Sequence, residues 1–378
     1  MNDLLSGIRV IEICSWYTGP MTACILADYG AEVIKIEPPG GDPFRISGTS
    51  RAGYGAMFMA ANRNKRSIVL DLKQPADKER ALQLIAKADV VIQNARPGVM
   101  ERLELDAETL RKRFPLLIYA SISGYGATGP LVAQSAFDPT IQALSGMAAV
   151  QGGADKPAVV RTMAADKTVP LIAAQAITSA LLRRERTGQG CTLHSAMLDA
   201  MVWWMWPDGM MNQTFLGGGE RSAADIATAD PICRTDDGYL VVAPHQEQAW
   251  QSFTEIVGRA ELRTDSRFCT AQRRMENLLD YYGEIRASFA GKTTEEWCAL
   301  LRARDVPCAP VLRRESVADY PQVVWNAIIE EVEHPVAGRY RSVRTPVRVD
   351  GTLADLASPV PAIGEHSDQI LAEIDRQS

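Results

Sequence analysis

The sequence predicts an α/β fold, in which a doubly wound, Rossmann-like parallel sheet forms a large domain and a smaller α+β domain follows. Apolar segments typical of buried strands alternate with amphipathic segments over roughly the first 200 residues. The pattern changes beyond that point, where clustered tryptophans, a glycine triplet and a hairpin signal appear. Parallel strands joined by helices explain the first part, and a separate unit explains the second.

The alternation in the first part can be assigned element by element. Segment 38–56 is rich in Gly, Pro and Ser and is expected to form a long loop. Gly188, in the run Arg-Thr-Gly-Gln-Gly, is placed to end a long helix. The expected strands are 8–14, 32–37, 67–72, 90–94 and 117–123, and the expected helices are 20–30, 76–88, 106–114 and 168–186.

The second part predicts a compact unit of a hairpin and helices. The turn signal Asp237-Gly238 lies between PICRT and YLVVA, so residues 231–243 are expected to form a hairpin. Helical patterns follow at 246–257, 272–290 and 293–304, and the chain ends in short strands at 344–348 and a helix at 366–375. We therefore expect a large domain over 1–215 and 330–378, a small domain over 230–325, and linkers at 216–229 and 326–340.

Composition limits the classes of partner. The chain has 378 residues, of which 46% are hydrophobic, enough to bury the cores of two domains. A net charge of −6 without a long basic run argues against nucleic acid as the main partner. No segment predicts a membrane span or a signal peptide, and the seven cysteines and four histidines lack metal-ligand spacing. These features predict a cytoplasmic protein with reduced thiols, no membrane partner and no metal site.

Residues 124–129, GYGATG, match the dinucleotide fingerprint literally. That fingerprint requires a helix that begins at its third glycine and an acidic residue after the next strand. Pro130 and a polar stretch follow instead, and the segment lies late in the expected domain. We therefore interpret it as a tight loop and expect no nicotinamide or flavin cofactor.

Basic residues near the ends of expected strands form a candidate ligand site. Lys73 follows one strand, Arg96 and Arg102 follow another, and the segment 62–66 (NRNKR) precedes a third. A solvated charged surface is the ordinary interpretation of such residues. However, the carboxyl ends of parallel strands line the ligand crevice of open α/β sheets, where phosphates find charge-assisted partners. Position alone leaves both interpretations open.

Asp166 stands near the expected start of the long helix. The commonest role of an aspartate at such a place is to cap the helix. The alternative is a nucleophile, because the helix dipole favours an ionised carboxylate and such a carboxylate can attack an activated acyl carbon. The residues around Asp166 by themselves favour the capping role.

Motifs in order over nearly the whole chain change that balance, because together they resemble class III CoA-transferases, the family of formyl-CoA and carnitine CoA-transferases. The motifs are Leu5-x-Gly7-x-x-Val10, Gly19-Pro20, Gly30-Ala31-Glu32-Val33-Ile34-Lys35-Ile36-Glu37, Asn64-Lys65-Arg66-Ser67-Ile68 with Asp71, Asn94-x-x-Pro97-Gly98, Ser123-Gly124-Tyr125-Gly126 with Gly129-Pro130, Arg186-Thr187-Gly188-x-Gly190, Asp237-Gly238-Tyr239, Val306-Pro307-Cys308, His334-Pro335 and Gly364-Glu365-His366.

The resemblance implies that Asp166 is a nucleophile that forms acyl-aspartyl anhydride and aspartyl-CoA intermediates. CoA would move from a donor acyl-CoA to an acceptor carboxylic acid, with no permanently bound cofactor, in an interlocked homodimer. The implied CoA-binding residues are Leu70, Lys73, Asn94, Ala95, Arg96, Arg102, Leu103, Ser123 and Met197. The implied substrate-pocket or oxyanion residues are Tyr17, Thr18, Phe137, Asp138, Gly217, Gly218 and Gly219, with the glycines as a mobile cover.

Three positions depart from the family pattern. Tyr17 stands where formyl-CoA transferase has a glutamine, so formate and oxalate are not expected substrates. Pro38 replaces an arginine that contacts the nucleotide in the family. Lys167 follows the nucleophile where a small residue is usual, and either stabilises the carboxylate or points to solvent. Aromatic and Met residues at 203–211 are a weak indication of a medium-sized or branched acyl group.

The closest alternative is an α-methylacyl-CoA racemase, which shares the fold and the aspartate. Racemisation needs two acid/base groups on opposite faces of the α-carbon. Phe137 and Gln246 stand where the racemases have a histidine and a glutamate, and a phenylalanine cannot exchange a proton. A CoA-thioester binding protein without turnover is a third possibility, against which the intact Asp166 argues.

Overall fold

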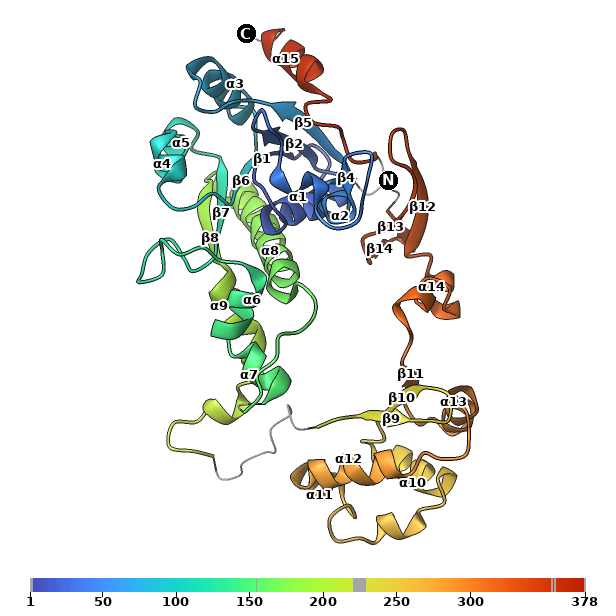
Figure 1. Cartoon of the computed structure of the whole chain (residues 1–378). Helices are drawn as coiled ribbons and strands as arrows, with labels where there is room; N and C mark the ends of the chain where they lie inside the picture. Colours follow the sequence, from blue (N-terminus) through green and yellow to red (C-terminus); the bar gives the residue numbers. More distant parts are fainter. Residues whose placement is uncertain (1–2, 154, 220–228, 355, 357, 377–378) are drawn as a thin grey trace. The chain divides into compact units, whose positions relative to one another are not determined.

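The computed structural model describes residues 3–153, 155–219, 229–354, 356 and 358–376 (Figure 1). Its contacts divide the chain into two compact units. The first comprises Met1–Ser145, Val160–Trp204 and Pro321–Ser378, and the second comprises Gly146–Val159 and Met205–Tyr320. The chain thus passes between the units after residues 145, 159, 204 and 320, whereas the sequence predicted two changes, near 215 and 330. No helix in the described ranges is both long and apolar enough to cross a bilayer.

A six-stranded parallel sheet forms the centre of the first unit. Its order is β5-β2-β1-β6-β7-β8, which is the doubly wound order 3-2-1-4-5-6 counted along these six strands. The prediction of a Rossmann-like parallel sheet is therefore confirmed. The strands are β1 (Arg9–Ile13), β2 (Glu32–Glu37), β5 (Lys65–Val69), β6 (Val90–Gln93), β7 (Ile118–Ser123) and β8 (Cys191–Ala196).

Two of these strands differ from the sequence prediction. Strand β5 begins at Lys65, two residues before the expected start. The charged Lys65 is buried inside the sheet, whereas the sequence analysis placed it in a basic segment before the strand. Strand β8 was not predicted at all. Its sequence, CTLHSA, has no apolar run; β8 lies at one edge of the sheet, where among the described strands it pairs with β7 alone.

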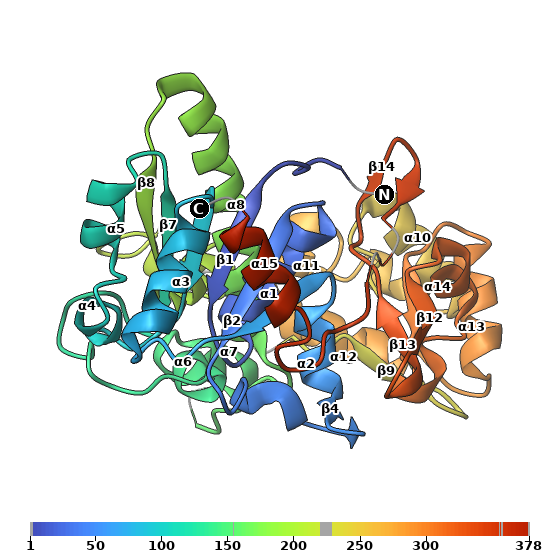
Figure 2. The ribbon, with the colours of Figure 1, turned by 90° about the horizontal axis from the view of Figure 1, so that it is seen from above.

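Helices cover both faces of the sheet, as a doubly wound fold requires. α1 (Thr18–Asp28) and α8 (Ala164–Thr187) pack on each other and on strands of one face. α3 (Pro75–Ile85), α5 (Ala107–Arg113) and α15 (Ser367–Asp375) enclose the apolar core on the other face. Figure 2 shows α3 and α15 side by side, so the end of the chain completes this layer.

Several short elements of the first unit were not predicted. The expected loop 38–56 contains a 3₁₀ turn at Pro43–Ile46 and a hairpin of β3 (Ser50–Arg51) and β4 (Tyr54–Gly55). The range expected as a linker, 326–340, contains β12 (Ile329–His334), which pairs with β13 (Gly338–Val343). The remaining short elements are α2 (Ala56–Asn62), α4 (Val99–Arg102), α6 (Asp138–Leu144), α9 (Met197–Met205), α14 (Pro321–Asn326), β14 (Arg348–Val349) and β15 (Thr352–Leu353).

The second unit is the expected α+β arrangement. Its hairpin of β9 (Ile232–Arg234) and β10 (Tyr239–Val242) turns at Asp237-Gly238, as predicted, and β11 (Cys308–Pro310) adds a third strand. The helix expected at 272–290 is two helices that meet at Asn277. Its helices are α7 (Met147–Gly152), α10 (Glu247–Ile256), α11 (Ala271–Glu276), α12 (Leu278–Ala287) and α13 (Thr294–Arg302).

Candidate active site at the carboxyl ends of the strands

The strand order reverses between β1 and β6, and ligands of open α/β sheets bind at this kind of point. Asn94, directly after β6, joins the two strand ends. Its Oδ1 accepts a hydrogen bond from the Ser15 amide at 3.0 Å, and its Nδ2 donates to the Ser15 carbonyl at 2.8 Å. The side chain of Asn94 therefore fixes the loop that follows β1.

Two cavities open beside this junction, and Ser15 lines both. The first, here called the basic cavity, has a volume of about 620 Å³ and carries Lys73, Lys78 and Arg102. The second, here called the aspartate cavity, has a volume of about 460 Å³ and contains Asp166. Both volumes are in the range of small-molecule sites.

Asp166 lies in the first turn of α8, which begins at Ala164 rather than at the expected residue 168. It is therefore not the N-cap residue, which is Met163. Its Oδ1 accepts a hydrogen bond of 2.5 Å from the hydroxyl of Thr18, at the start of α1. Burial raises the pKa of the Asp166 carboxyl; the Thr18 hydrogen bond opposes that rise, and the charge of Asp138 adds to it. Burial thus counteracts the helix dipole that was expected to keep the carboxyl ionised.

Asp138 performs the capping that Asp166 does not. Its Oδ2 accepts hydrogen bonds from the amides of Ala165 at 2.7 Å and of Asp166 at 3.2 Å, which are N–H groups of the first turn. Its Oδ1 accepts from Gln142, whose side chain also bonds Val160. Asp138 is 4% exposed and does not line the aspartate cavity. Asp138 therefore holds the first turn of α8, and its expected place in the pocket or at an oxyanion stays a prediction.

Replacing Asp138 with Asn is expected to shift the acid limb of the activity profile to lower pH. The negative charge of Asp138 raises the pKa of Asp166, so its removal lowers that pKa and keeps Asp166 ionised in more acidic solution. The measurement is kcat/KM for acyl exchange against pH. Asp106→Asn is the matched control, because Asp106 caps α5 by accepting a hydrogen bond from the Thr109 amide at 3.0 Å. An acid limb that moves in neither variant, or equally in both, contradicts the prediction.

Aromatic rings form one part of the wall of the aspartate cavity. Tyr17 and Phe137, both expected in the site, line it together with Trp16 and Phe44. Trp16 packs edge-on against Phe137, with ring centroids 5.8 Å apart, and lies 6.1 Å from the ring of Phe44. The sequence analysis missed Trp16 and Phe44, although Trp16 adjoins the expected Tyr17 and Thr18.

The expected CoA-binding residues are divided between the two cavities. Lys78, which was not predicted, adds a cation to the basic cavity one helical turn into α3. Pro38, which replaces the arginine of the family pattern, also lines the basic cavity. Leu70, Lys73, Arg102 and Leu103 line the basic cavity, and Asn94, Ala95, Arg96, Ser123 and Met197 line the aspartate cavity, as do Tyr17, Thr18 and Phe137.

Other basic residues are engaged away from both cavities. Lys167 is exposed, and its Nζ donates to the Thr162 hydroxyl at 2.6 Å rather than to Asp166. In the basic segment 62–66, Arg63 pairs with Asp28 and Arg66 pairs with Glu32 and Glu373. This segment is therefore part of the internal ion pairing and not a ligand site.

Three expected site residues lie in the second unit. Gly217, Gly218 and Gly219 are exposed, and their role as a cover stays a prediction. The GYGATG segment 124–129 is an irregular loop after β7 and opens no helix, as expected. The described part of the chain contains no group of three or more His, Cys, Asp or Glu side chains that could hold a metal ion.

Comparison with known proteins identifies the family. The model of CoA-transferase family III matches residues 5–367. The chain is 32% identical to the "Probable fatty acyl-CoA transferase Rv3272" of Mycobacterium tuberculosis, over 97% of each chain. It is 31% identical to succinyl-CoA:glutarate CoA-transferase of Mus musculus, over 98% of this chain and 86% of the relative, and 30% identical to formyl-CoA:oxalate CoA-transferase of Shigella sonnei, over 99% and 96%.

Solved structures agree with the sequence comparison. The orthorhombic crystal structure of Rv3272 from M. tuberculosis superposes with a TM-score of 0.83 at 32% identity, covering 96% of this chain and 98% of that chain. The structure of a CAIB/BAIF family protein from Brucella suis gives a TM-score of 0.82 at 30% identity, covering 99% and 100%. The chain therefore belongs to CoA-transferase family III, as its motifs predicted, and is a transferase enzyme.

Proposed function

We propose that this transferase moves CoA from a donor acyl-CoA to an acceptor carboxylic acid by covalent catalysis on Asp166. The observation that carries the proposal is the meeting of the two cavities at Ser15. A CoA thioester combines phosphates at one end with a reactive acyl carbon at the other. The cations of the basic cavity suit the phosphates, and the Asp166 carboxylate is a nucleophile in the adjoining cavity.

The first half of the reaction consumes the donor. A carboxylate oxygen of Asp166 attacks the thioester carbonyl carbon, the C–S bond breaks, and an acyl-aspartyl anhydride and CoA thiolate result. The thiolate then attacks the aspartyl carbonyl carbon of the anhydride. The donor leaves as a free carboxylate, and aspartyl-CoA thioester remains on the enzyme.

The second half repeats these steps in reverse order. The acceptor carboxylate attacks the aspartyl-CoA thioester and releases CoA thiolate, forming a second anhydride. The thiolate attacks the acceptor acyl carbon of that anhydride, which gives the new acyl-CoA and regenerates the Asp166 carboxylate. No net proton is gained or lost, so the cycle needs no general acid or base.

The surroundings of Asp166 favour its attack. Burial penalises the charged carboxylate and raises its pKa, and formation of the anhydride removes that charge, so part of the penalty is relieved on the way to the intermediate. The Thr18 hydroxyl donates to Oδ1 and orients the carboxylate. As the anhydride forms, the same hydroxyl is a candidate donor to the developing oxyanion.

CoA binding is proposed for both cavities. Lys73 and Arg102, with the additional Lys78, would hold phosphates, and Leu70 and Leu103 would contact apolar parts of the nucleotide end. Asn94, Ala95, Arg96, Ser123 and Met197 would line the path of the thioester arm toward Asp166. Because Tyr17 stands where formyl-CoA transferase has a glutamine, formate and oxalate are not proposed as substrates.

We also propose an interlocked homodimer, as the family resemblance implies. Trp203 and Trp204 on α9 are 69% and 49% exposed, and Leu171 and Leu182 on α8 are 62% and 53% exposed. Large apolar side chains at such exposure are typical of a surface that another subunit covers. A cytoplasmic location stays a prediction.

Trapping with hydroxylamine tests the covalent mechanism. The enzyme is incubated with acetyl-CoA or succinyl-CoA and hydroxylamine, digested, and examined by mass spectrometry. A hydroxamate on the peptide that contains Asp166 is the expected result, because hydroxylamine attacks both the anhydride and the aspartyl thioester. Unmodified Asp166 despite acyl exchange contradicts the mechanism. Solvent deuterium that enters the α-carbon of a branched acyl-CoA without acyl exchange contradicts the transferase in favour of a racemase.

A further inference from the structure

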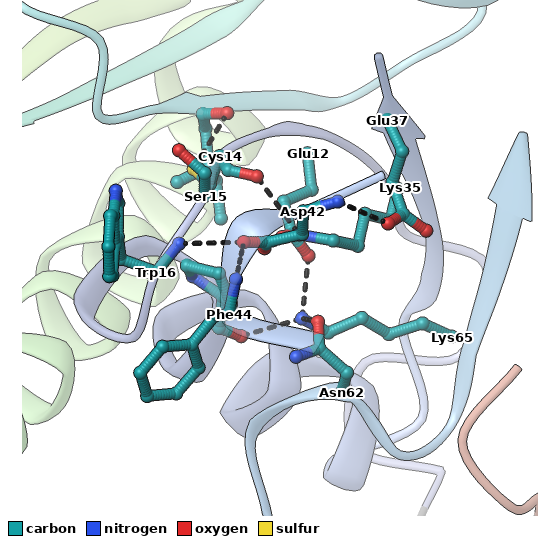
Figure 3. A network of polar contacts seen from close by, with 12 residues as sticks. Glu12, Cys14, Ser15, Trp16, Lys35, Glu37, Asp42, Phe44, Asn62 and Lys65 are labelled. Carbon is teal, nitrogen blue, oxygen red and sulfur yellow. Dashed lines mark hydrogen bonds and ion pairs between the residues drawn. The ribbon is translucent and has the colours of Figure 1, made fainter. Parts of the chain in front are cut away.

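A buried network of charges holds one wall of the aspartate cavity in place (Figure 3). Lys35 on β2 pairs with Glu12 on β1 at 2.7 Å and with Asp42 Oδ2 at 3.0 Å, and all three side chains are at most 2% exposed. The other oxygen of Asp42 accepts hydrogen bonds from the backbone amides of Trp16 at 3.1 Å and Phe44 at 2.9 Å. The network thus ends on Trp16 and Phe44, two of the aromatic residues of the wall.

Trp16 has a backbone conformation that requires such support. Its φ of 67° lies in the left-handed region, which bulky residues rarely adopt. Such a conformation persists where the surrounding structure fixes it, and it is frequent at ligand sites. Here the bond to Asp42 fixes the backbone, while the indole is 46% exposed at the cavity. The costly conformation places a large apolar ring where a ligand can contact it.

The aromatic wall adjoins the groups that touch Asp166. Tyr17 and Trp16 directly precede Thr18, which donates to the Asp166 carboxylate. Phe137 directly precedes Asp138, which accepts from the Asp166 amide, and Phe137 is 55% exposed. An acyl group attached to Asp166 would therefore have these rings as neighbours.

Charge is scarce in the same cavity. Among the described residues that line it, Arg96 is the one cation, and its guanidinium donates to the Ser135 hydroxyl at 2.8 Å. The one carboxylate is Asp166 itself. A second carboxylate would find one cation, Arg96, among the described residues that line the cavity, and a largely apolar or uncharged wall elsewhere, where burying a charge is unfavourable. An apolar group would gain contact with the rings instead.

We infer that the aspartate cavity selects carboxylic acids that carry a bulky apolar group, branched or aromatic, over dicarboxylic acids and very small acids. The inference rests on the proposed function, because it assumes that the acyl group is carried on Asp166. It extends that function by naming the substrate class and the specificity-determining residues, Trp16 and Phe137.

A panel of acceptor acids of matched shape tests the inference. With acetyl-CoA as the donor, the compared acids are 5,5-dimethylhexanoate, 3-phenylpropanoate, adipate, isotopically labelled acetate and 4-(trimethylammonio)butanoate; the label makes the otherwise degenerate exchange with acetate visible as labelled acetyl-CoA. We expect kcat/KM for the two bulky apolar acids to exceed that for adipate and acetate by about tenfold or more, the size of discrimination that apolar pockets achieve. Exchange that is fastest with adipate or acetate overturns the inference. So does a preference for the cationic acid, which would make the rings a cation–π cage.

Two variants test whether the aromatic wall of the aspartate cavity determines the selectivity for bulky apolar acids. Trp16→Ala and Phe137→Ala should each lower kcat/KM for 3-phenylpropanoate by about ten- to a hundredfold, and by a clearly larger factor than they lower kcat/KM for acetate. Trp16 and Phe137 are about half exposed, so both variants are expected to fold, which circular dichroism checks. Trp325→Ala is the control, because Trp325 on α14 is 83% exposed and outside the cavity. Equal losses for all acids in both variants overturn the inference, whereas absence of exchange with every acid contradicts the proposed function itself.

Discussion

Replacing Asp166 with Asn is expected to lower the rate of acyl exchange by about a thousandfold or more, the loss typical when a covalent nucleophile is removed. Asparagine has the shape of aspartate and can still accept the hydrogen bond from Thr18, but its amide is too weak a nucleophile to open a thioester. The rate is measured with the acid that the wild-type enzyme uses best, under single-turnover and steady-state conditions. Asp166→Ala is made in parallel, because an asparagine can revert to aspartate by deamidation.

The same variant separates catalysis from folding. The pKa of Asp166 is raised in the folded protein, so folding binds a proton there at pH values between the unfolded and the folded pKa. The charged carboxylate therefore costs stability above that window, and the neutral Asn is expected to leave the thermal midpoint at pH 7 unchanged or higher. CoA binding by calorimetry should be retained. Substantial exchange by a stably folded Asp166→Ala enzyme is incompatible with covalent catalysis.

The sequence predicted most of the parallel sheet because its central strands are rich in Val and Ile, as is typical of strands buried on both faces. It missed β8 for the converse reason, since an edge strand can be built from polar residues such as Thr192 and His194. The ends of the helices and strands were predicted less accurately than their presence. The start of α8 moved by four residues, and that shift changed the interpretation of Asp166 from a possible cap to a first-turn side chain.

The candidate site was predicted only in part, because its contacts join distant segments. Asp138 caps the helix of Asp166 across 28 residues of sequence, and Thr18 reaches Asp166 across 148. No local sequence pattern predicts such pairs. The prediction that Asp166 is a nucleophile therefore rested on the family motifs rather than on the residues around it. Trp16 was not predicted as a site residue, because a single aromatic residue in a loop is common. The hydrogen bond from its backbone amide to Asp42 becomes visible only in the fold.

The charges inside the central strands carried a signal that could have been used. Glu12 and Lys35 interrupt apolar strands and lie opposite each other in the parallel register of β1 and β2. In a half-exposed antiparallel sheet such residues would face water. In a doubly wound sheet both faces are covered by helices, so charges at these positions must be buried and paired. Lys65 completes the group by pairing with Glu12 at 2.6 Å.

Replacing Glu12 with Gln is therefore expected to destabilise the first unit by about 3–5 kcal/mol, the cost of removing one partner from a buried ion pair. Glu12 is fully buried and neutralises both Lys35 and Lys65, so the variant leaves two ammonium groups with insufficient negative charge. The measurement is urea unfolding followed by fluorescence and circular dichroism. Glu108→Gln is the control, because the Glu108–Lys112 pair is more than 70% exposed on both sides, where solvent screens it, and its loss should leave the unfolding midpoint nearly unchanged.

The pH dependence distinguishes the loss of charge from a loss of packing. Burial alone would raise the pKa of Glu12, but Lys35 and Lys65 hold it below its ordinary value. The stability that its charge contributes is present above the unfolded pKa and is lost as pH falls through the lower, folded pKa. The wild type and Glu12→Gln should thus differ most near neutral pH and converge in acid. A difference that stays constant over this range would mean that the shape of the side chain matters and not its charge. Because Lys35 also holds Asp42, which fixes Trp16, a charge effect at Glu12 should extend to the aromatic wall of the aspartate cavity.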